Sequence, residues 1–211
     1  MRKPFEETKI GRVLSMLTDV IFAGLLWCLC SLPVITIGAS SAALYYATVK
    51  SIRHERGRLA KTFFGAFKSN FVASFKLWLI YIIYALVFIA NNFAVMMMGE
   101  NASGLMSMFV KLMFIPAIMP LPWFFAYVSR FENTTKATIS YVYYLCVKNL
   151  WRTLALIVML VLAVGVSWVM PGILPLLPGA VCLSMSYIIE PVFKKITEDM
   201  DDSNIDQWYN E

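Results

Sequence analysis

Charged residues are scarce in this chain. Only 15% of its 211 residues are Asp, Glu, Lys or Arg, whereas 60% are hydrophobic, and the mean hydropathy is +0.69. A soluble domain of this length covers its core with polar side chains, and the chain has too few of them to do so. The composition therefore argues against a soluble globular protein and favours one that is surrounded by lipid.

Residues that carry chemistry are also few. His54 is the sole histidine, and it lies in an arginine-rich segment where a solvated side chain is expected. The sequence has no nucleophile elbow, phosphate-binding glycine loop, HExxH motif or paired carboxylates. The cysteines lie in or beside apolar segments and lack the spacing of metal ligands or of a redox pair; they are Cys28, Cys30, Cys146 and Cys182. We therefore expect no catalytic residue, cofactor or metal, and interpret the cysteines as buried free thiols.

The basic residues gather into clusters that are separated by long apolar stretches. Of 18 lysines and arginines, all but Lys111 belong to four clusters, in residues 2–12, 50–76, 130–152 and 194–195. Basic residues near the ends of membrane spans resist translocation, so the clusters mark the cytoplasmic side. Because they flank membrane-length segments, their expected partner is a bilayer with anionic headgroups and not nucleic acid.

Six apolar segments predict an all-α, polytopic bundle of transmembrane helices, arranged as three hairpins with both chain ends in the cytoplasm. The segments are residues 13–33, 35–49, 77–98, 105–128, 154–170 and 173–189. Residues 1–196 are interpreted as a single integral membrane domain. Residues 197–211 are interpreted as an acidic cytoplasmic tail, since no basic residue balances their carboxylates.

The second segment, residues 35–49, is short. A helix of this length covers about 22 Å, whereas the hydrocarbon core is about 30 Å thick. It therefore forms either a short span or a re-entrant half-helix. If it did not cross, the basic residues of the 50–76 cluster would face outward, so we predict that it crosses.

Two further segments carry local signals. Three prolines predict a kink or break in the inner half of the fourth segment: Pro116, Pro120 and Pro122. The polar turn before that segment, residues 99–104, has no basic residue, as expected for an outer turn.

Ahead of the third segment, four phenylalanines recur every four residues: Phe63, Phe67, Phe71 and Phe75. This face predicts a helix that either lies on the inner leaflet or extends the third span inward.

Polar residues inside the apolar segments are the first candidates for a site. Asp19 is the only acidic residue well inside a span, where a carboxylate is costly and needs a partner or a route to the interface. Asn91 and Asn92 lie near the outer end of the third segment, and a hydrogen bond between helices is favoured over contact with a substrate. Glu190 is expected at the inner interface near Lys194.

Small residues around the second segment form another candidate. Gly38 opens a run of six small residues, which favours close packing of helices. A thin helix behind Pro33 and Thr36 would alternatively expose backbone carbonyls to a polar cavity, as in transporters with broken helices.

The run Leu-Pro-Val-Ile-Thr-Ile-Gly-Ala at residues 32–39, followed by Ala42, Leu44, Tyr45 and Tyr46, resembles the opening signature of the YesL-like family. Phe63-Phe64, Phe67-Lys68 and Asn70-Phe71 are similar to a second block of that family, so the resemblance covers residues 13 to 90. The family is a bacterial membrane family classed as a domain of unknown function. The resemblance implies a multi-pass protein of the bacterial plasma membrane, encoded beside carbohydrate ABC importers, glycoside-degrading enzymes and sensor kinases. It implies no catalytic or ligand-binding residues.

Two functions follow as expectations. The first is a non-enzymatic accessory protein associated with carbohydrate uptake, with subunits of a sugar ABC importer or a sensor kinase as partners. The second is an autonomous permease or channel for a small solute, which Asp19, the prolines of the fourth segment and the short second segment would favour.

Overall fold

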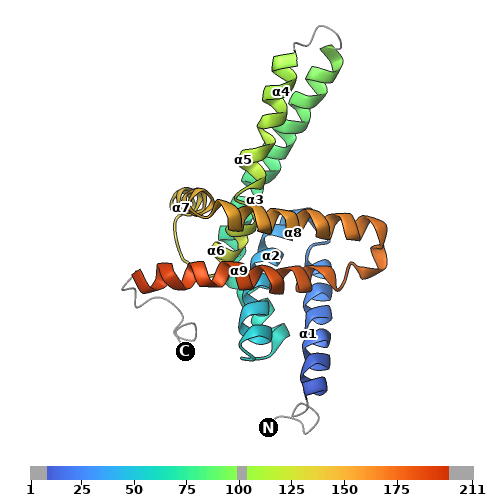
Figure 1. Ribbon diagram of the computed structural model, residues 1–211, viewed down its shortest axis with the longest axis vertical. Helices are drawn as coiled ribbons and strands as arrows, with labels where there is room; N and C mark the ends of the chain where they lie inside the picture. Colours follow the sequence, from blue (N-terminus) through green and yellow to red (C-terminus); the bar gives the residue numbers. More distant parts are fainter. Residues whose placement is uncertain (1–8, 99–103, 200–211) are drawn as a thin grey trace.

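The computed structural model describes residues 9–98 and 104–199, and every regular element within these ranges is a helix (Figure 1). The prediction of an all-α protein is therefore confirmed for the described residues. The helices are α1 (Lys9–Cys30), α2 (Ile37–Ala47), α3 (Leu59–Met98), α4 (Gly104–Leu112), α5 (Phe114–Ile118), α6 (Leu121–Val128), α7 (Thr135–Lys148), α8 (Leu150–Val169) and α9 (Leu177–Asp199). Three short helical turns join them: η2 (Val34–Thr36), η3 (Thr48–Arg53) and η5 (Pro171–Ile173).

Four helical stretches of the described chain are long and apolar enough to cross a membrane. They are Gly11–Cys30, Leu59–Met98, Gly104–Val128 and Leu150–Val169. These stretches overlap the first, third, fourth and fifth predicted spans. The second and sixth, residues 35–49 and 173–189, are not among them, so the count of six spans and the side of each terminus stay predictions.

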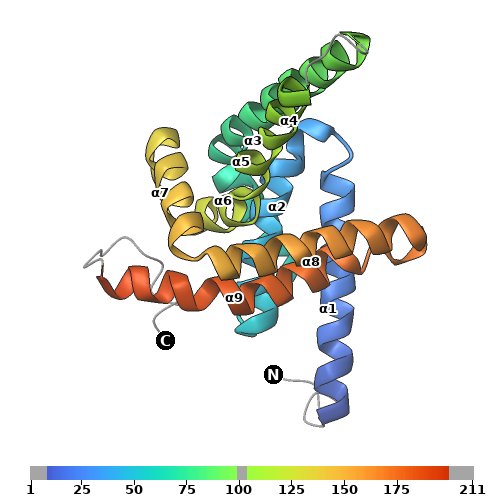
Figure 2. The same ribbon diagram turned by 45° about the horizontal axis from the view of Figure 1, so that its top comes forward.

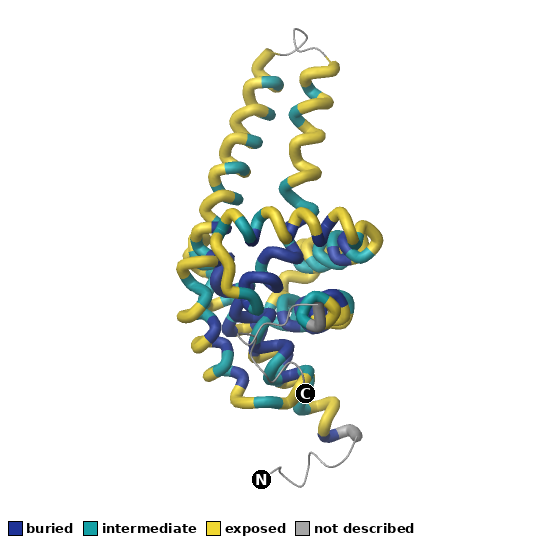
Figure 3. Tube along the Cα trace, turned by 90° about the vertical axis from the view of Figure 1, so that its left-hand side faces the viewer, coloured by how far each residue is buried: buried dark blue, intermediate teal, exposed yellow. Residues whose placement is uncertain are grey.

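The short second segment forms the centre of the molecule. Most residues of α2 are buried, and the helix contacts α1, α3, α6 and α9. Small side chains make this possible, because a narrow helix lets several neighbours approach at once. Around α2 lie α1, α6, α7, α8, α9 and the first half of α3, and together these helices are called the body. In Figure 3 the buried residues, in dark blue, lie in this body. A helix that is apolar on all sides is typical of a protein interior, so α2 is a core helix of the bundle.

α8 and α9 run antiparallel to each other and lie across α1 (Figures 1 and 2). Two glycines occupy the crossing of α1 and α9. A Cβ on Gly24 would overlap the carbonyl oxygen of Pro175, and a Cβ on Gly179 would overlap that of Val20. The absence of side chains at both positions therefore lets the two backbones touch.

α3 is a continuous helix of 40 residues. Its length is about 60 Å, twice the thickness of a hydrocarbon core. The four phenylalanines follow one another along its first half, with successive ring centroids 6.4, 5.6 and 6.0 Å apart. Phe63 is fully buried against the body. Of the two interpretations of this segment, the structure therefore favours an extension of the third span over a separate helix on the leaflet.

The far end of α3 pairs with α4, and the two project from the body as a hairpin (Figures 1 and 3). The expected break follows: three short helices, α4, α5 and α6, replace one span, and Pro122 lies in the first turn of α6. The predicted outer turn falls mostly on residues 99–103, which lie outside the described residues. α9 continues to Asp199, three residues beyond the predicted end of the membrane domain, and the rest of the predicted tail also lies outside them.

Candidate functional site

The polar positions singled out in the sequence do not meet in one site. Asp19 is half-buried on α1. Asn92 donates its side-chain amide to the carbonyl of Phe88 in its own helix, at 2.8 Å. Asn91 is exposed and lines a pocket between α3 and α4, together with Tyr84, Val87, Phe88, Val110 and Met113. The two asparagines thus differ: one bonds within its helix, and the other faces a groove.

Thr36 and Gly38 fasten the start of α2 to its neighbours. Thr36 Oγ1 lies 2.6 Å from the carbonyl oxygen of Cys30 and 2.7 Å from that of Pro33, so its hydroxyl donates to the turn after α1. A Cβ on Gly38 would lie 2.7 Å from Cβ of Trp78 and 2.9 Å from a backbone oxygen of α3. Pro33 itself is exposed. At Gly38 the geometry is therefore that of close helix packing.

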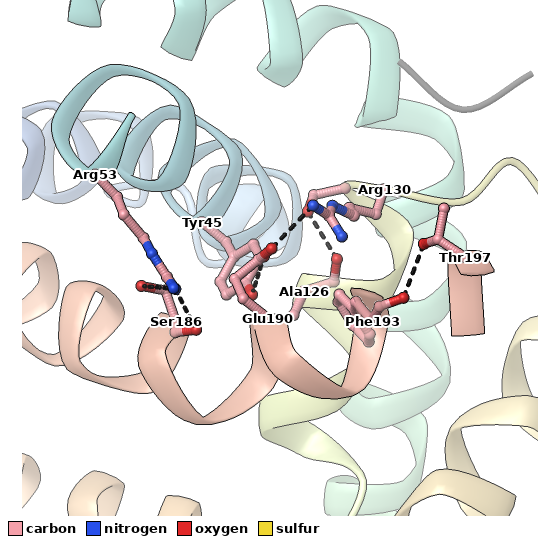
Figure 4. A network of polar contacts seen from close by, with 9 residues as sticks. Tyr45, Arg53, Ala126, Arg130, Ser186, Glu190, Phe193 and Thr197 are labelled. Atoms are coloured by element: carbon pink, nitrogen blue, oxygen red, sulfur yellow. Dashed lines mark hydrogen bonds and ion pairs between the residues drawn. The ribbon is translucent and has the colours of Figure 1, made fainter. Parts of the chain in front are cut away.

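A buried ion pair lies where α2, α6 and α9 meet (Figure 4). Arg130 Nη2 is 2.9 Å from Glu190 Oε2, and the two side chains are only 3% and 9% exposed. The hydroxyl of Tyr45 donates to the other carboxylate oxygen of Glu190 at 2.8 Å. One carboxylate therefore joins residues that are 60 and 145 positions away in the sequence.

The turn that follows α6 positions Arg130 beside the carboxylate of Glu190. α6 stops at Val128, and Ser129 donates its hydroxyl back to the carbonyl of Ala126 at 2.7 Å. The chain then turns, and the guanidinium of Arg130 lies 5.8 Å from the ring centroid of Phe193, one turn beyond Glu190 on α9. A guanidinium that is stacked on a ring and paired with a carboxylate is well placed inside a protein.

Arg53 extends the cluster along α9. It is the last residue of the wide π-type turn η3, which ends the helical run that begins with α2. Its guanidinium donates to the carbonyl oxygen of Ser186 at 2.8 Å and lies 4.6 Å from the ring centroid of Tyr187. Together with Tyr45, it fastens the α2–η3 run to α9 at two points one turn apart.

Burial dominates the electrostatics of the cluster. It raises the pKa of Glu190, while Arg130, the hydrogen bond from Tyr45, and Arg53 act in the opposite direction. Burial also lowers the pKa of His54, and the neighbouring guanidinium groups lower it further. Within the described residues, no three His, Cys, Asp or Glu side chains are placed to hold a metal ion. The arrangement is suited to locking helices together.

Sequence reasoning did not find this cluster. Glu190 was expected near Lys194, but Lys194 is exposed, and the partner of Glu190 is Arg130. A signal was present: Glu190 is the only acidic residue between Glu132 and Glu198, beside an apolar segment. Such a lone carboxylate needs a partner, but the sequence offers many arginines and does not say which one is close.

Fold and cluster define a class: an all-α protein with helices able to cross a membrane, whose central helix is tied to its neighbours by a buried ion pair. Residues 20–92 match the model of a family described as a protein of unknown function, DUF624. The match begins in α1 and ends in α3. It supports the resemblance to a family of unknown function, whereas the narrower YesL-like name is not confirmed. No curated protein matches the chain, and no solved structure matches it.

Proposed function

We propose that the chain is a non-enzymatic accessory protein of the bacterial plasma membrane, with both termini in the cytoplasm. Its proposed role is to associate with a carbohydrate importer of the ABC type or with the sensor of such a system. The carbohydrate context rests on the resemblance of residues 32–39 to the YesL-like signature. The role as a docking protein rests on how the polar and apolar residues are distributed.

The observation that carries the proposal is that the charged groups at the centre of the molecule bind protein groups while the apolar faces of the outer helices stay open. Arg130, Glu190 and Tyr45 form one bonded set, and Arg53 binds the backbone of α9. These contacts rigidify the centre and leave no charge of the set pointing at a solute. By contrast, α3, α4 and α8 expose long rows of apolar side chains, which lipid or the helices of another protein can cover.

Co-purification from native membranes tests this function. The tagged chain is extracted in a mild detergent that keeps ABC importers assembled, and the eluted proteins are identified by mass spectrometry. Importer subunits or a sensor kinase are expected in stoichiometric amounts. Recovery of the chain alone, while importers from the same extract remain intact, would contradict an accessory role.

Reconstitution separates this function from that of an autonomous permease. Vesicles containing only the purified chain are expected to be no leakier to sugars and small ions than empty vesicles. A solute flux that changes when Asp19→Asn or Thr36→Val is introduced would instead favour the permease.

A further inference from the structure

Lys111 stands apart from every other basic residue of the chain. It is the one lysine outside the four basic clusters, and it lies in the membrane-length stretch Gly104–Val128. With a rise of about 1.5 Å per residue, it is about 10 Å along the helix axis from Gly104. Its side chain is exposed and has no acidic partner within the described part of the chain. A lysine at such a depth is costly unless it finds a carboxylate, water or the headgroups.

Lys111 belongs to a part of the molecule that has few contacts with the rest. We define the projecting hairpin as residues 84–98 of α3 together with α4; it extends away from the body (Figures 1 and 3). Beside the hairpin, α3 meets the chain just after α4: Phe88 stacks on Phe114, the first residue of α5, with ring centroids 5.2 Å apart, and Tyr84 donates a hydrogen bond to the carbonyl of Met113. The remaining surface is almost wholly apolar and exposed, including Phe93, Met96 and Phe109.

A second polar residue lies at the same level of the hairpin. Asn91 is exposed and lines the pocket between the two helices, and Val110, the neighbour of Lys111 in the sequence, lines that pocket too. The cation and the amide thus lie at a similar level of an otherwise apolar hairpin, but on different faces of it, because successive residues of a helix point about 100° apart. Lipid tails do not satisfy the ammonium group of Lys111, whereas a helix with a carboxylate would.

We propose that the projecting hairpin docks a transmembrane helix of a different membrane protein, and that a carboxylate on this helix pairs with Lys111 inside the bilayer. The inference rests on the proposed accessory function and adds the place and chemistry of contact. Charge complementarity selects the occupant: the partner helix carries an aspartate or glutamate at the depth of Lys111, and apolar side chains above and below it.

Site-specific photo-crosslinking in native membranes tests the contact. A photoreactive residue replaces Met108 on α4, which is 58% exposed and lies on the same helical face as Lys111, or Leu162 on α8, which is 62% exposed and serves as the matched position off the hairpin. The Met108 probe is expected to capture one membrane protein with an acidic residue in a span. Lys111→Met should lower the yield about tenfold, and Lys111→Arg should preserve it. Lys136→Met, which removes another exposed lysine, should leave it unchanged.

A charge exchange completes the test. Lys111→Glu should abolish the cross-link, and a lysine in place of the partner's carboxylate should restore it.

Three outcomes would overturn the proposed contact. An unchanged yield in Lys111→Met would mean that the ammonium group binds lipid headgroups. Capture of a second copy of this chain, or of a protein without an acidic residue in its spans, would overturn it as well. A partner captured only from Leu162 would refute the hairpin contact and keep the accessory function, whereas no partner from either probe and none on co-purification would refute both.

Discussion

Glu190 is under two opposing influences, since burial favours its neutral form and the guanidinium of Arg130 favours its ionised form. Burial is the larger, so the pKa of this carboxyl is raised in the folded protein. A group whose folded pKa is raised adds stability that is present below its unfolded value of about 4.3 and is lost as the pH rises through the folded pKa. The ion pair is therefore a device for fixing geometry more than a source of net stability.

Removal of Arg130 should expose this balance. In Arg130→Met the carboxyl keeps its burial and loses its guanidinium, so its pKa rises further. We expect a loss of about 3–5 kcal/mol near neutral pH, because a buried charge is left without its partner. The loss should shrink as the pH falls through the raised pKa of this carboxyl, because Glu190 is then protonated. Unfolding in detergent, followed as a function of pH, measures both effects.

The double variant provides the control for this experiment. Arg130→Met with Glu190→Gln has no buried charge and keeps an acceptor for the hydroxyl of Tyr45. It should recover most of the lost stability and show no pH dependence from this site. A double variant as unstable as Arg130→Met alone would mean that packing, and not charge, accounts for the loss.

Gly38 illustrates how one missing side chain sets the distance between two helices. In Gly38→Ala the new methyl group would meet Trp78 at 2.7 Å and a backbone oxygen of α3 at 2.9 Å, and neither is a flexible side-chain end. We expect a loss of about 1–3 kcal/mol, the usual cost of overpacking. Thermal unfolding checks it, with Gly165→Ala on α8 as the matched change, since no atom lies within 4 Å of a Cβ there. Equal effects of the two changes would argue against close packing at Gly38.

Among the elements, α3 shows most clearly what hydropathy can and cannot determine. The apolar run of residues 77–98 predicted a helix, and the structure places this run in the second half of α3. The phenylalanine repeat before this run predicted a helix with the four rings on one face. It left two placements of that helix open, because a face of rings and lysines is compatible both with a helix on the inner leaflet and with an inward extension of the third span. Burial of Phe63 decides between them, and burial depends on residues distant in the sequence.

Thiol labelling along α3 tests this placement. In a cysteine-free background, cysteines replace Phe64 in the first half of α3 and Ile89 in the second, both exposed on the protein surface. A water-soluble maleimide in open membranes should modify the first and leave the second unmodified, because about half of a 60 Å helix lies beyond the hydrocarbon core. Rapid reaction at position 89 would place the projecting hairpin in water.

For the whole molecule, the sequence identified helices, their approximate ends and the polar residues that needed explanation. It did not identify the arrangement. Nothing in the hydropathy of α8 and α9 indicates that they lie across α1, because the crossing depends on contact between Gly24 and Pro175 and between Gly179 and Val20. The pairing of Arg130 with Glu190 was hidden for the same reason. Both features join residues that are far apart in the chain, whereas periodicity reports only on neighbours.

Membrane topology is the property of the whole molecule on which the functional proposals depend. The second segment forms the buried helix α2, so its direction places the 50–76 cluster relative to the first span. If the basic clusters mark the cytoplasm, a cysteine replacing Arg56 should resist an impermeant thiol reagent in intact cells and react after permeabilisation. A cysteine replacing Ser103, in the predicted outer turn, should react in intact cells. Labelling of position 56 from outside would show that the proposed orientation is inverted. Lys111 would then lie in the cytoplasmic half of its span, and the carboxylate of the partner helix would have to lie in that half too.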